Sequence, residues 1–299
     1  MRKNTAYRKT AGSVLPIDAE TITMSKRQRR AIPRFVTPIV ETHCHLDYLG
    51  EDALAETLAA AEEAGIERVV TIAVAPDNLA TVRRLAEADP RVWCTQGIHP
   101  HEAGNYDHVV EAAIREGAGH PRVVAIGEIG LDYYYDHADR GAQRDAFARQ
   151  LTLAAELSLP VVIHSREADE DTETILSEYL PALSRRGVIH SFTSGQRLAE
   201  FALEAGFYLG FNGITTFRNA DNVRAIVELT PVEQLLLETD APYLTPVPYR
   251  GTTNAPCYLP FIAEALADLK GLSVEALLAI TRRSSYNLFF PGDVPALAA

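Results

Sequence analysis

Two histidines, His43 and His45, stand two residues apart directly after the apolar run 38–40. An acidic pair at 51–52 follows, so the segment fits a strand that runs into a loop and then a helix. Residues two apart on a strand project from the same face, so both imidazoles point to one side and Cys44 to the other. This spacing permits a bidentate metal clamp, although pairs of surface histidines at this spacing are common. The rest of the chain must supply further ligands.

Short apolar runs alternate with amphipathic stretches along the whole body of the chain. The predicted strands are 39–42, 68–74, 92–97, 122–127, 161–163, 187–189, 207–211 and 234–238. The predicted helices are 53–64, 78–88, 107–117, 140–157, 170–183, 196–205, 221–229, 259–269 and 273–283. Eight successive βα units with strands apolar enough for burial on both faces predict an α/β fold, a single (β/α)8 TIM barrel. A doubly wound open sheet is the alternative, but no glycine-rich nucleotide-binding motif follows any strand.

The C-terminal ends of barrel strands carry the chemistry in this architecture. Five of the nine histidines and two carboxylates fall at the predicted strand ends: His43, His45, His99, Glu128, His164, His190 and Asp240. A single histidine at such a position is most often structural, whereas seven metal-binding side chains at one end of one fold indicate a metal site. Imidazole and carboxylate ligands suit Zn²⁺ or Mn²⁺, with Mg²⁺ as a further possibility.

Six of these side chains are the predicted metal ligands, with His99 set aside. Six exceed the needs of one catalytic ion that keeps an open position, but they suit two ions that share a carboxylate. Glu128 follows Gly127 and lies midway round the barrel, so we predict that it bridges the ions. The first ion is then held by His43, His45 and Asp240, and the second by His164 and His190. Two such ions lower the pKa of an attacking water, and Asp240 can orient that water or accept its proton.

Charge is unevenly distributed along the 299 residues. Residues 1–38 carry nine Lys/Arg against two acids, a balance of +7, and the remainder carries 19 against 38, a balance of −19. We expect 1–37 to be a disordered basic leader, with a nucleic-acid-binding arm as the alternative. The barrel is expected at 38–290 and a flexible tail at 291–299. A body this acidic does not attract nucleic acid generally, so a phosphate substrate requires a locally positive site.

Three cysteines are widely spaced without a C-x-x-C motif, which favours a reducing, cytoplasmic compartment over a disulfide framework. No apolar run approaches the ~20 residues of a membrane span. The basic N-terminus lacks the apolar segment of a signal peptide. No sequence feature points to an obligate protein partner.

Seven motifs, taken together and in this order, resemble the TatD family of metal-dependent deoxyribonucleases. They are THCHLD at 42–47, GIHPH at 97–101, GEIGLDYY at 127–134, VVIHSR at 161–166, VIH at 188–190, LETDAPYL at 237–244 and PYRG at 248–251. The resemblance covers about residues 38–290. It implies a TIM-type barrel, a metal-dependent phosphodiester hydrolase and the metal ligands given above. It also implies that His99 and Arg250 lie at the substrate, on phosphate. The segment 250–256 departs from the family pattern by losing two cations and a carboxylate.

We therefore expect a binuclear hydrolase that cleaves phosphodiester bonds, specifically an exonuclease-type DNase acting from strand ends. A metal-dependent amidase or deacylase, for example one acting on aminoacyl-tRNA, is the alternative among enzymes, because the same water attacks a carbonyl. A non-catalytic nucleic-acid-binding protein is the alternative from another class, which the full ligand set argues against. The three tyrosines at 133–135 either stack on bases or pack at the barrel mouth.

Overall fold

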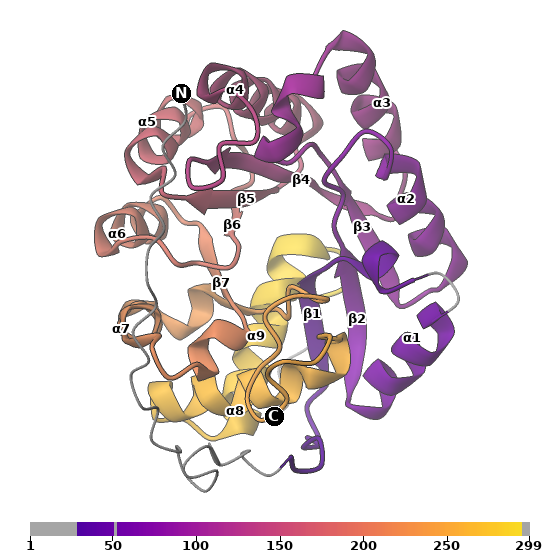
Figure 1. Ribbon diagram of the computed structural model, residues 1–299, viewed down its shortest axis with the longest axis vertical. Helices are drawn as coiled ribbons and strands as arrows, with labels where there is room; N and C mark the ends of the chain where they lie inside the picture. The colour runs from indigo at the N-terminus through magenta and orange to yellow at the C-terminus, as the bar shows by residue number, and fades with distance from the viewer. Residues whose placement is uncertain (1–28, 51–52, 295–299) are drawn as a thin grey trace, which may run out of the picture.

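Eight strands form one parallel sheet in the computed structural model, which describes residues 29–50 and 53–294 (Figure 1). The strands are β1 (Ile39–Cys44), β2 (Ile66–Thr71), β3 (Val92–Gln96), β4 (Val123–Asp132), β5 (Val161–Arg166), β6 (Gly187–Ile189), β7 (Tyr208–Phe211) and β8 (Leu235–Leu237). Each strand pairs in parallel with the next one along the chain, in the order β1 to β8. All eight predicted strands are present.

The first and last strands meet at their C-terminal ends, which nearly closes the sheet into a barrel. The amide of Asp240 donates to the carbonyl of His43 at 2.9 Å, and the amide of His45 donates to the carbonyl of Ala241 at 2.7 Å. The Thr42 hydroxyl adds a bond to the carbonyl of Leu237 at 2.8 Å. The predicted (β/α)8 TIM barrel is thereby confirmed.

Helices follow the strands in alternation and lie outside the ring that the strands form (Figure 1). They are α1 (Leu54–Glu63), α2 (Leu79–Ala88), α3 (His108–Ala118), α4 (Arg140–Leu157), α5 (Asp169–Tyr179), α6 (Gln196–Glu204), α7 (Asp221–Leu229), α8 (Leu259–Lys270) and α9 (Val274–Phe289). Carboxylate and hydroxyl caps fix several starts: Asp107, Asp139 and Ser273 each accept from backbone amides of the first helical turn.

Two apolar clusters hold the barrel together. The larger one joins one face of the strands to the surrounding helices and includes Cys44, as the alternation at His43 and His45 predicts. The smaller one joins six strands across the interior, through Val40, Val70, Val124, Val162, Val188 and Leu236. Aromatic side chains from the end of α9 pack into this inner cluster. Val40 and Val162 precede the histidines of β1 and β5, and Val188 precedes His190, so α9 closes the end opposite the candidate site.

Strand β4 is longer than predicted, which corrects the expectation that it ends before Glu128. It continues to Asp132 because its second half pairs with β5, through partners such as Gly130 and His164. A register shift between Gly127 and Ile129 lets the chain remain in the sheet. Glu128 therefore lies within the strand, and the strand's last residue is a second carboxylate.

The expected leader at 1–37 falls mainly outside the described residues, as does most of the tail at 291–299. The last part of the leader, from 29 to 37, packs against the barrel. Arg30 forms an ion pair with Glu264 of α8, and the carboxylate of Glu275 on α9 accepts from two backbone amides at 36 and 37. Basic composition alone does not predict this contact. No helix among 29–50 and 53–294 is long and apolar enough to cross a membrane.

Candidate active site

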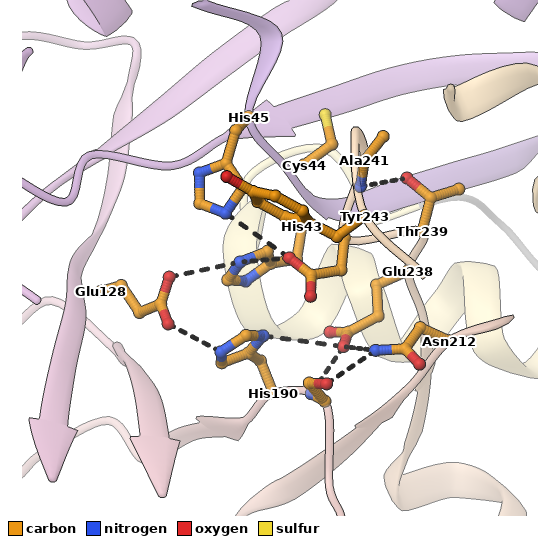
Figure 2. Close-up of polar contacts among 12 residues, drawn as sticks. His43, Cys44, His45, Glu128, His190, Asn212, Glu238, Thr239, Ala241 and Tyr243 are labelled. Atoms are coloured by element: carbon orange, nitrogen blue, oxygen red, sulfur yellow. Dashed lines mark hydrogen bonds and ion pairs between the residues drawn. The ribbon is translucent and has the colours of Figure 1, made fainter. Parts of the chain in front are cut away.

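The end of β1 brings His43 and His45 to the barrel mouth, where both side chains are buried. His43 Nε2 lies 3.7 Å and His45 Nε2 lies 3.5 Å from the same oxygen of Asp240, which follows β8. Figure 2 shows that the rings of His43 and His45 lie close together. The closure of the barrel thus unites one pair of histidines with one acid, as the sequence predicts.

Glu128 lies at the centre of the cluster, and its two oxygens face different histidines (Figure 2). Oε2 is 3.4 Å from Nε2 of His43. Oε1 is 2.8 Å from Nε2 of His190 and 3.1 Å from Nδ1 of His164. His99 Nε2 also lies 3.4 Å from Oε1. The carboxylate therefore stands between the β1 histidines and the β5 and β6 histidines.

Glycines allow the backbone around Glu128 to pack this closely. A Cβ on Gly127 would lie 2.7 Å from the Cβ of Val162 on β5, and one on Gly97 would lie 2.6 Å from the carbonyl carbon of Gly127. Separations this short do not occur between real side chains and backbone, so only glycine fits at either position. The glycine before Glu128 is therefore required by the packing of β4 against β5.

The polar atoms of the cluster fit a metal centre. Nε2 of His43 is fully buried and has no hydrogen-bond partner among the described residues, which is costly unless a cation takes its lone pair. Ligand atoms about 2.0–2.1 Å from a tetrahedral ion stand roughly 3.3 Å apart, and the separations here run from 2.8 to 3.7 Å. Three groups of side chains come close enough to hold an ion: His43, His190 and Asp240; His43, His45 and Glu128; and His99, Glu128 and His164.

Charge in the cluster keeps its carboxylates ionised. Burial raises the pKa of Glu128, but the charge of His190 and the hydrogen bonds from His164 and His190 outweigh burial and place that pKa well below its usual range. Burial likewise raises the pKa of Asp240, and the hydrogen bond with His45 together with the histidine charges lowers it below the ordinary value. Both acids are thus available as anionic ligands or as proton acceptors.

Comparison with known proteins gives the same picture at the level of the whole barrel. Residues 40–290 match the model of the family described as TatD related DNase. The chain belongs to this family. It is similar to the "Uncharacterized metal-dependent hydrolase YabD" of Bacillus subtilis, with 36% identity over 84% of this chain and 98% of the relative. It also resembles the "3'-5' ssDNA/RNA exonuclease TatD" of Erwinia amylovora, with 43% identity over 66% of this chain and 78% of the relative.

Solved structures of TatD proteins share the fold. The crystal structure of the TatD homologue YjjV from Escherichia coli K12 matches with a TM-score of 0.80 and 29% identity, over 84% of this chain and 97% of that one. A TatD-family hydrolase from Entamoeba histolytica matches with a TM-score of 0.75 at 20% identity, which shows the fold alone. This TatD-family protein is therefore a metal-dependent hydrolase built on a TIM barrel.

His99 has the geometry of a hydrogen-bond donor rather than that of a ligand. Its Nδ1 accepts from the backbone amide of His101 at 3.1 Å, so the proton of the neutral ring lies on Nε2, which points toward Glu128. Burial, partly offset by the charge of Glu128, lowers the pKa of His99 to about 4, so the ring is neutral at pH 7. A neutral N–H aimed into the cluster suits a substrate oxygen, in line with the predicted substrate role.

Arg250 does not join the cluster. Its guanidinium lies over the ring of Phe217 at 4.1 Å, and in the described part of the chain no hydrogen bond or ion pair connects it to the histidines or acids. Phe217 belongs to the loop between β7 and α7, so Arg250 lies on the side of the mouth formed by the last strands. Its predicted substrate contact stays a prediction.

Asp132 belongs to the site but was missed by sequence reasoning. Its Oδ2 lies 3.0 Å from Nε2 of His164 and 3.1 Å from Nε2 of His101, and its Oδ1 accepts from the amides of Tyr134 and Tyr135. When the carboxylate accepts a hydrogen bond from Nε2–H of His164, the proton of the neutral ring stays on Nε2. Nδ1 of His164 is then free to bind a metal. The signal was the position of the acid four residues after Glu128, on the same side of a strand that continues.

Glu238 is a second missed acid, fully buried behind His190. Its Oε1 accepts from the amide of Ser191 at 2.6 Å and lies 3.7 Å from Nδ1 of His190 (Figure 2). The position of Gly210 on β7 leaves room for this carboxylate, because a Cβ there would lie 2.3 Å from Oε2 of Glu238. A charged residue inside an apolar strand end, two before Asp240, was the available signal.

The three tyrosines at 133–135, which were expected either to stack on bases or to pack at the barrel mouth, differ in their surroundings. Tyr133 packs against the core and bonds to Asp171, as a structural residue does. Tyr134 and Tyr135 are about half exposed, and the guanidinium of Arg166 lies 4.2 Å and 4.8 Å from the centres of their rings. Of these three tyrosines, Tyr134 and Tyr135 are therefore the ones whose rings are accessible.

Proposed function

We propose that this TatD-family protein hydrolyses phosphodiester bonds in nucleic acid, as a DNase that acts from strand ends. Two divalent ions, Zn²⁺, Mn²⁺ or Mg²⁺, are its cofactors. His43, His45 and Asp240 would hold the first ion, His164 and His190 would hold the second, and Glu128 would be shared between them. When bound, such ions lower the pKa of a water and offset the charge that develops on the phosphate.

The observation that carries this proposal is that the two carboxylate oxygens of Glu128 face different histidines. A carboxylate shared by two ions has to present one oxygen to each of them. Here Oε2 faces His43 at 3.4 Å, while Oε1 faces His190 at 2.8 Å and His164 at 3.1 Å. Five further ligands arranged on both sides of the buried Glu128 carboxylate support a binuclear centre.

Residues of the chain supply proton transfer and orientation. Asp240 is ionised, and its side chain is 13% exposed, so a water that enters the site can reach it. We assign it the role of general base for that water. His99 donates from Nε2 to a phosphate oxygen, which it can do as a neutral ring. The attacking water and the phosphate are thereby held against each other.

The exposed rings of Tyr134 and Tyr135 support a single-stranded end as substrate. Bases of a strand without a partner can stack on aromatic faces, whereas bases inside a duplex are covered by their neighbours. The name of the Erwinia relative describes 3′-to-5′ action on single-stranded DNA and RNA, and we propose the same direction for this chain.

The cytoplasm is the compartment that we propose. All three cysteines are free and buried. Free thiols persist where the surroundings are reducing.

The test is hydrolysis of end-labelled single-stranded DNA, duplex DNA and RNA by purified protein with Mn²⁺, Mg²⁺ or Zn²⁺, beside a panel of peptide amides. The proposal predicts stepwise shortening of single-stranded DNA that depends on the metal and begins at the 3′ end. A block at that end should stop the reaction. Metal-dependent turnover of amides with none of nucleic acid would instead favour the amidase alternative.

A further inference from the structure

A pocket with a volume of about 410 Å³ opens among the loops that follow β6, β7 and β8. Three loops line it. Thr193 belongs to the loop after β6, Phe217 and Arg218 to the loop after β7, and Arg250 to the loop after β8. Asn219 and Asn222 add amide groups to its wall. We name it the Arg218–Arg250 pocket.

Both arginines of the pocket lack an acidic partner. Among the described residues, neither Arg218 nor Arg250 forms an ion pair or a side-chain hydrogen bond, and Arg250 has only the ring of Phe217 beneath it at 4.1 Å. The nearby acid Asp221 is already paired with Arg224, which also donates to the carbonyls of the same loop. Two guanidinium groups without acidic partners make the pocket locally positive, although the protein as a whole has a net charge of −12.

The pocket is connected to the proposed metal ligands through its loops. Thr193 follows His190 by three residues, and Asn212 begins the β7–α7 loop directly after the strand. The Asn212 amide donates to the Ser191 hydroxyl at 2.8 Å and lies 3.5 Å from the Glu238 carboxylate. Figure 2 shows Asn212 and Glu238 next to His190. The pocket thus lies on the β6–β8 side of the mouth, fixed to the strand that carries a ligand.

We propose that the Arg218–Arg250 pocket binds a backbone phosphate of the nucleic-acid substrate, next to the phosphate that is cleaved. Guanidinium groups bind phosphate through two parallel N–H donors, and the stacking of Arg250 on Phe217 holds one of these forks in place. The hydroxyl of Thr193 and the amides of Asn219 and Asn222 offer further donors. This inference rests on the proposed function and narrows its substrate class to strands longer than a dinucleotide.

A consequence is that substrate length, and not only the scissile bond, sets the efficiency of the enzyme. A small diester such as bis(p-nitrophenyl) phosphate reaches the ions but has no second phosphate for the pocket. A ten-nucleotide strand fills both positions. The higher cleavage efficiency on the longer strand must then depend on Arg218. It must also fall as the salt concentration rises, because salt weakens the contact between arginine and phosphate.

The experiment compares the full chain with Arg218→Ala, Arg218→Lys and the control Arg283→Ala. Arg283 is also exposed and, in the described residues, without an ion pair, but it lies on α9, outside the three loops. Binding of a phosphorothioate ten-nucleotide strand is followed by fluorescence anisotropy over a salt series. Hydrolysis of the natural strand and of the small diester is measured in parallel.

Loss of one charged donor pair should weaken binding of the strand by about ten-fold in Arg218→Ala and reduce the salt slope by ~0.7. The fall in kcat/KM should be at least several-fold greater for the strand than for the small diester. Arg218→Lys should recover part of the loss, and Arg283→Ala should match the wild type. If Arg218→Ala binds and cleaves the strand as Arg283→Ala does, the pocket proposal is overturned while the proposed function stands. A wild-type protein that neither binds nor cleaves nucleic acid overturns both.

Discussion

The main-chain amide of Asp240 donates a hydrogen bond to the carbonyl of His43, at 2.9 Å. His43 lies on the first strand and Asp240 follows the last one, and their side chains approach each other within 3.7 Å. One contact therefore closes the barrel and assembles half of the proposed metal site. Folding and metal binding should be coupled at this seam.

Removal of metal should lower the melting temperature. An ion present at 100 times its dissociation constant stabilises the folded state by about 2.7 kcal/mol, which for a chain of this size corresponds to roughly 4–5 °C. Thermal unfolding with and without a chelator measures the shift, and added Mn²⁺ or Zn²⁺ should reverse it. Identical melting of the two forms would show that the cluster holds no ion.

Asp132→Asn should weaken metal binding while preserving the fold. Asp132 accepts a hydrogen bond from Nε2–H of His164 and so fixes the tautomer whose Nδ1 faces Glu128. An asparagine whose amide group turns toward Nε2 no longer fixes that tautomer. Loss of such a partner lowers metal affinity by ~10- to 100-fold. Activity titrated against metal should shift by this factor and recover in excess metal. Asp136→Asn, on the exposed loop after β4, is the control; equal affinity in the two variants would argue against a positioning role.

Gly130→Ala should destabilise the barrel next to His164. Gly130 has φ +133°, and a Cβ there would lie 2.0 Å from the carbonyl oxygen of His164. The methyl group must push β4 and β5 apart, at a cost of about 1–3 kcal/mol. Gly104→Ala is the matched control because nothing lies within 4 Å of the added carbon. Calorimetry should show a lower melting temperature for the first variant alone, and equal melting would refute the steric argument.

Glu41 should make the metal-free protein less stable as the pH rises. Complete burial raises the pKa of this carboxyl to about 8, from an ordinary value of 4.5. Folding therefore favours the protonated form, and the contribution to stability is full below pH 4.5 and is lost as the pH rises toward 8, by up to ~1.4 kcal/mol per pH unit.

Glu41→Gln should remove that slope. The glutamine oxygen can still accept from the amides of His43 and Thr239, and its side chain carries no charge at any pH. Urea unfolding between pH 5 and 8, in the presence of a chelator, compares the variant with wild type and with the exposed Glu56→Gln. A wild-type slope that persists in Glu41→Gln would assign the pH dependence to other groups.

Much of the fold and the ligand set is predictable because the order of strands along the chain determines where each strand lies in a parallel barrel. Each short apolar run ends at the same face, so the residue after it is a site candidate without any knowledge of contacts. The alternation of His43, Cys44 and His45 gave the correct faces for the same reason. These predictions depend only on strand period and strand order.

Other features depend on contacts that period and order do not determine. Whether β4 ends at Gly127 or at Asp132 depends on pairing with β5, and that pairing is what brings the second carboxylate to His164. Gly187 begins β6 as predicted, but the reason that glycine is required there is a contact: a Cβ would lie 2.0 Å from the carbonyl oxygen of Val161. The position of Arg250 depends on Phe217, which stands 33 residues earlier in the chain.

The most direct test of the central claim is the metal content and turnover of Glu128→Ala. This side chain faces both sets of histidines, so its loss removes a ligand from each of the two proposed ions. Elemental analysis should find about two ions per wild-type chain and one or none in the variant, and hydrolysis of single-stranded DNA under saturating Mn²⁺ should fall by ~10³ or more. The metal-free variant should melt near the wild-type temperature, since neither apolar cluster includes Glu128. A variant that retains two ions and cleaves DNA at the wild-type rate would contradict the account.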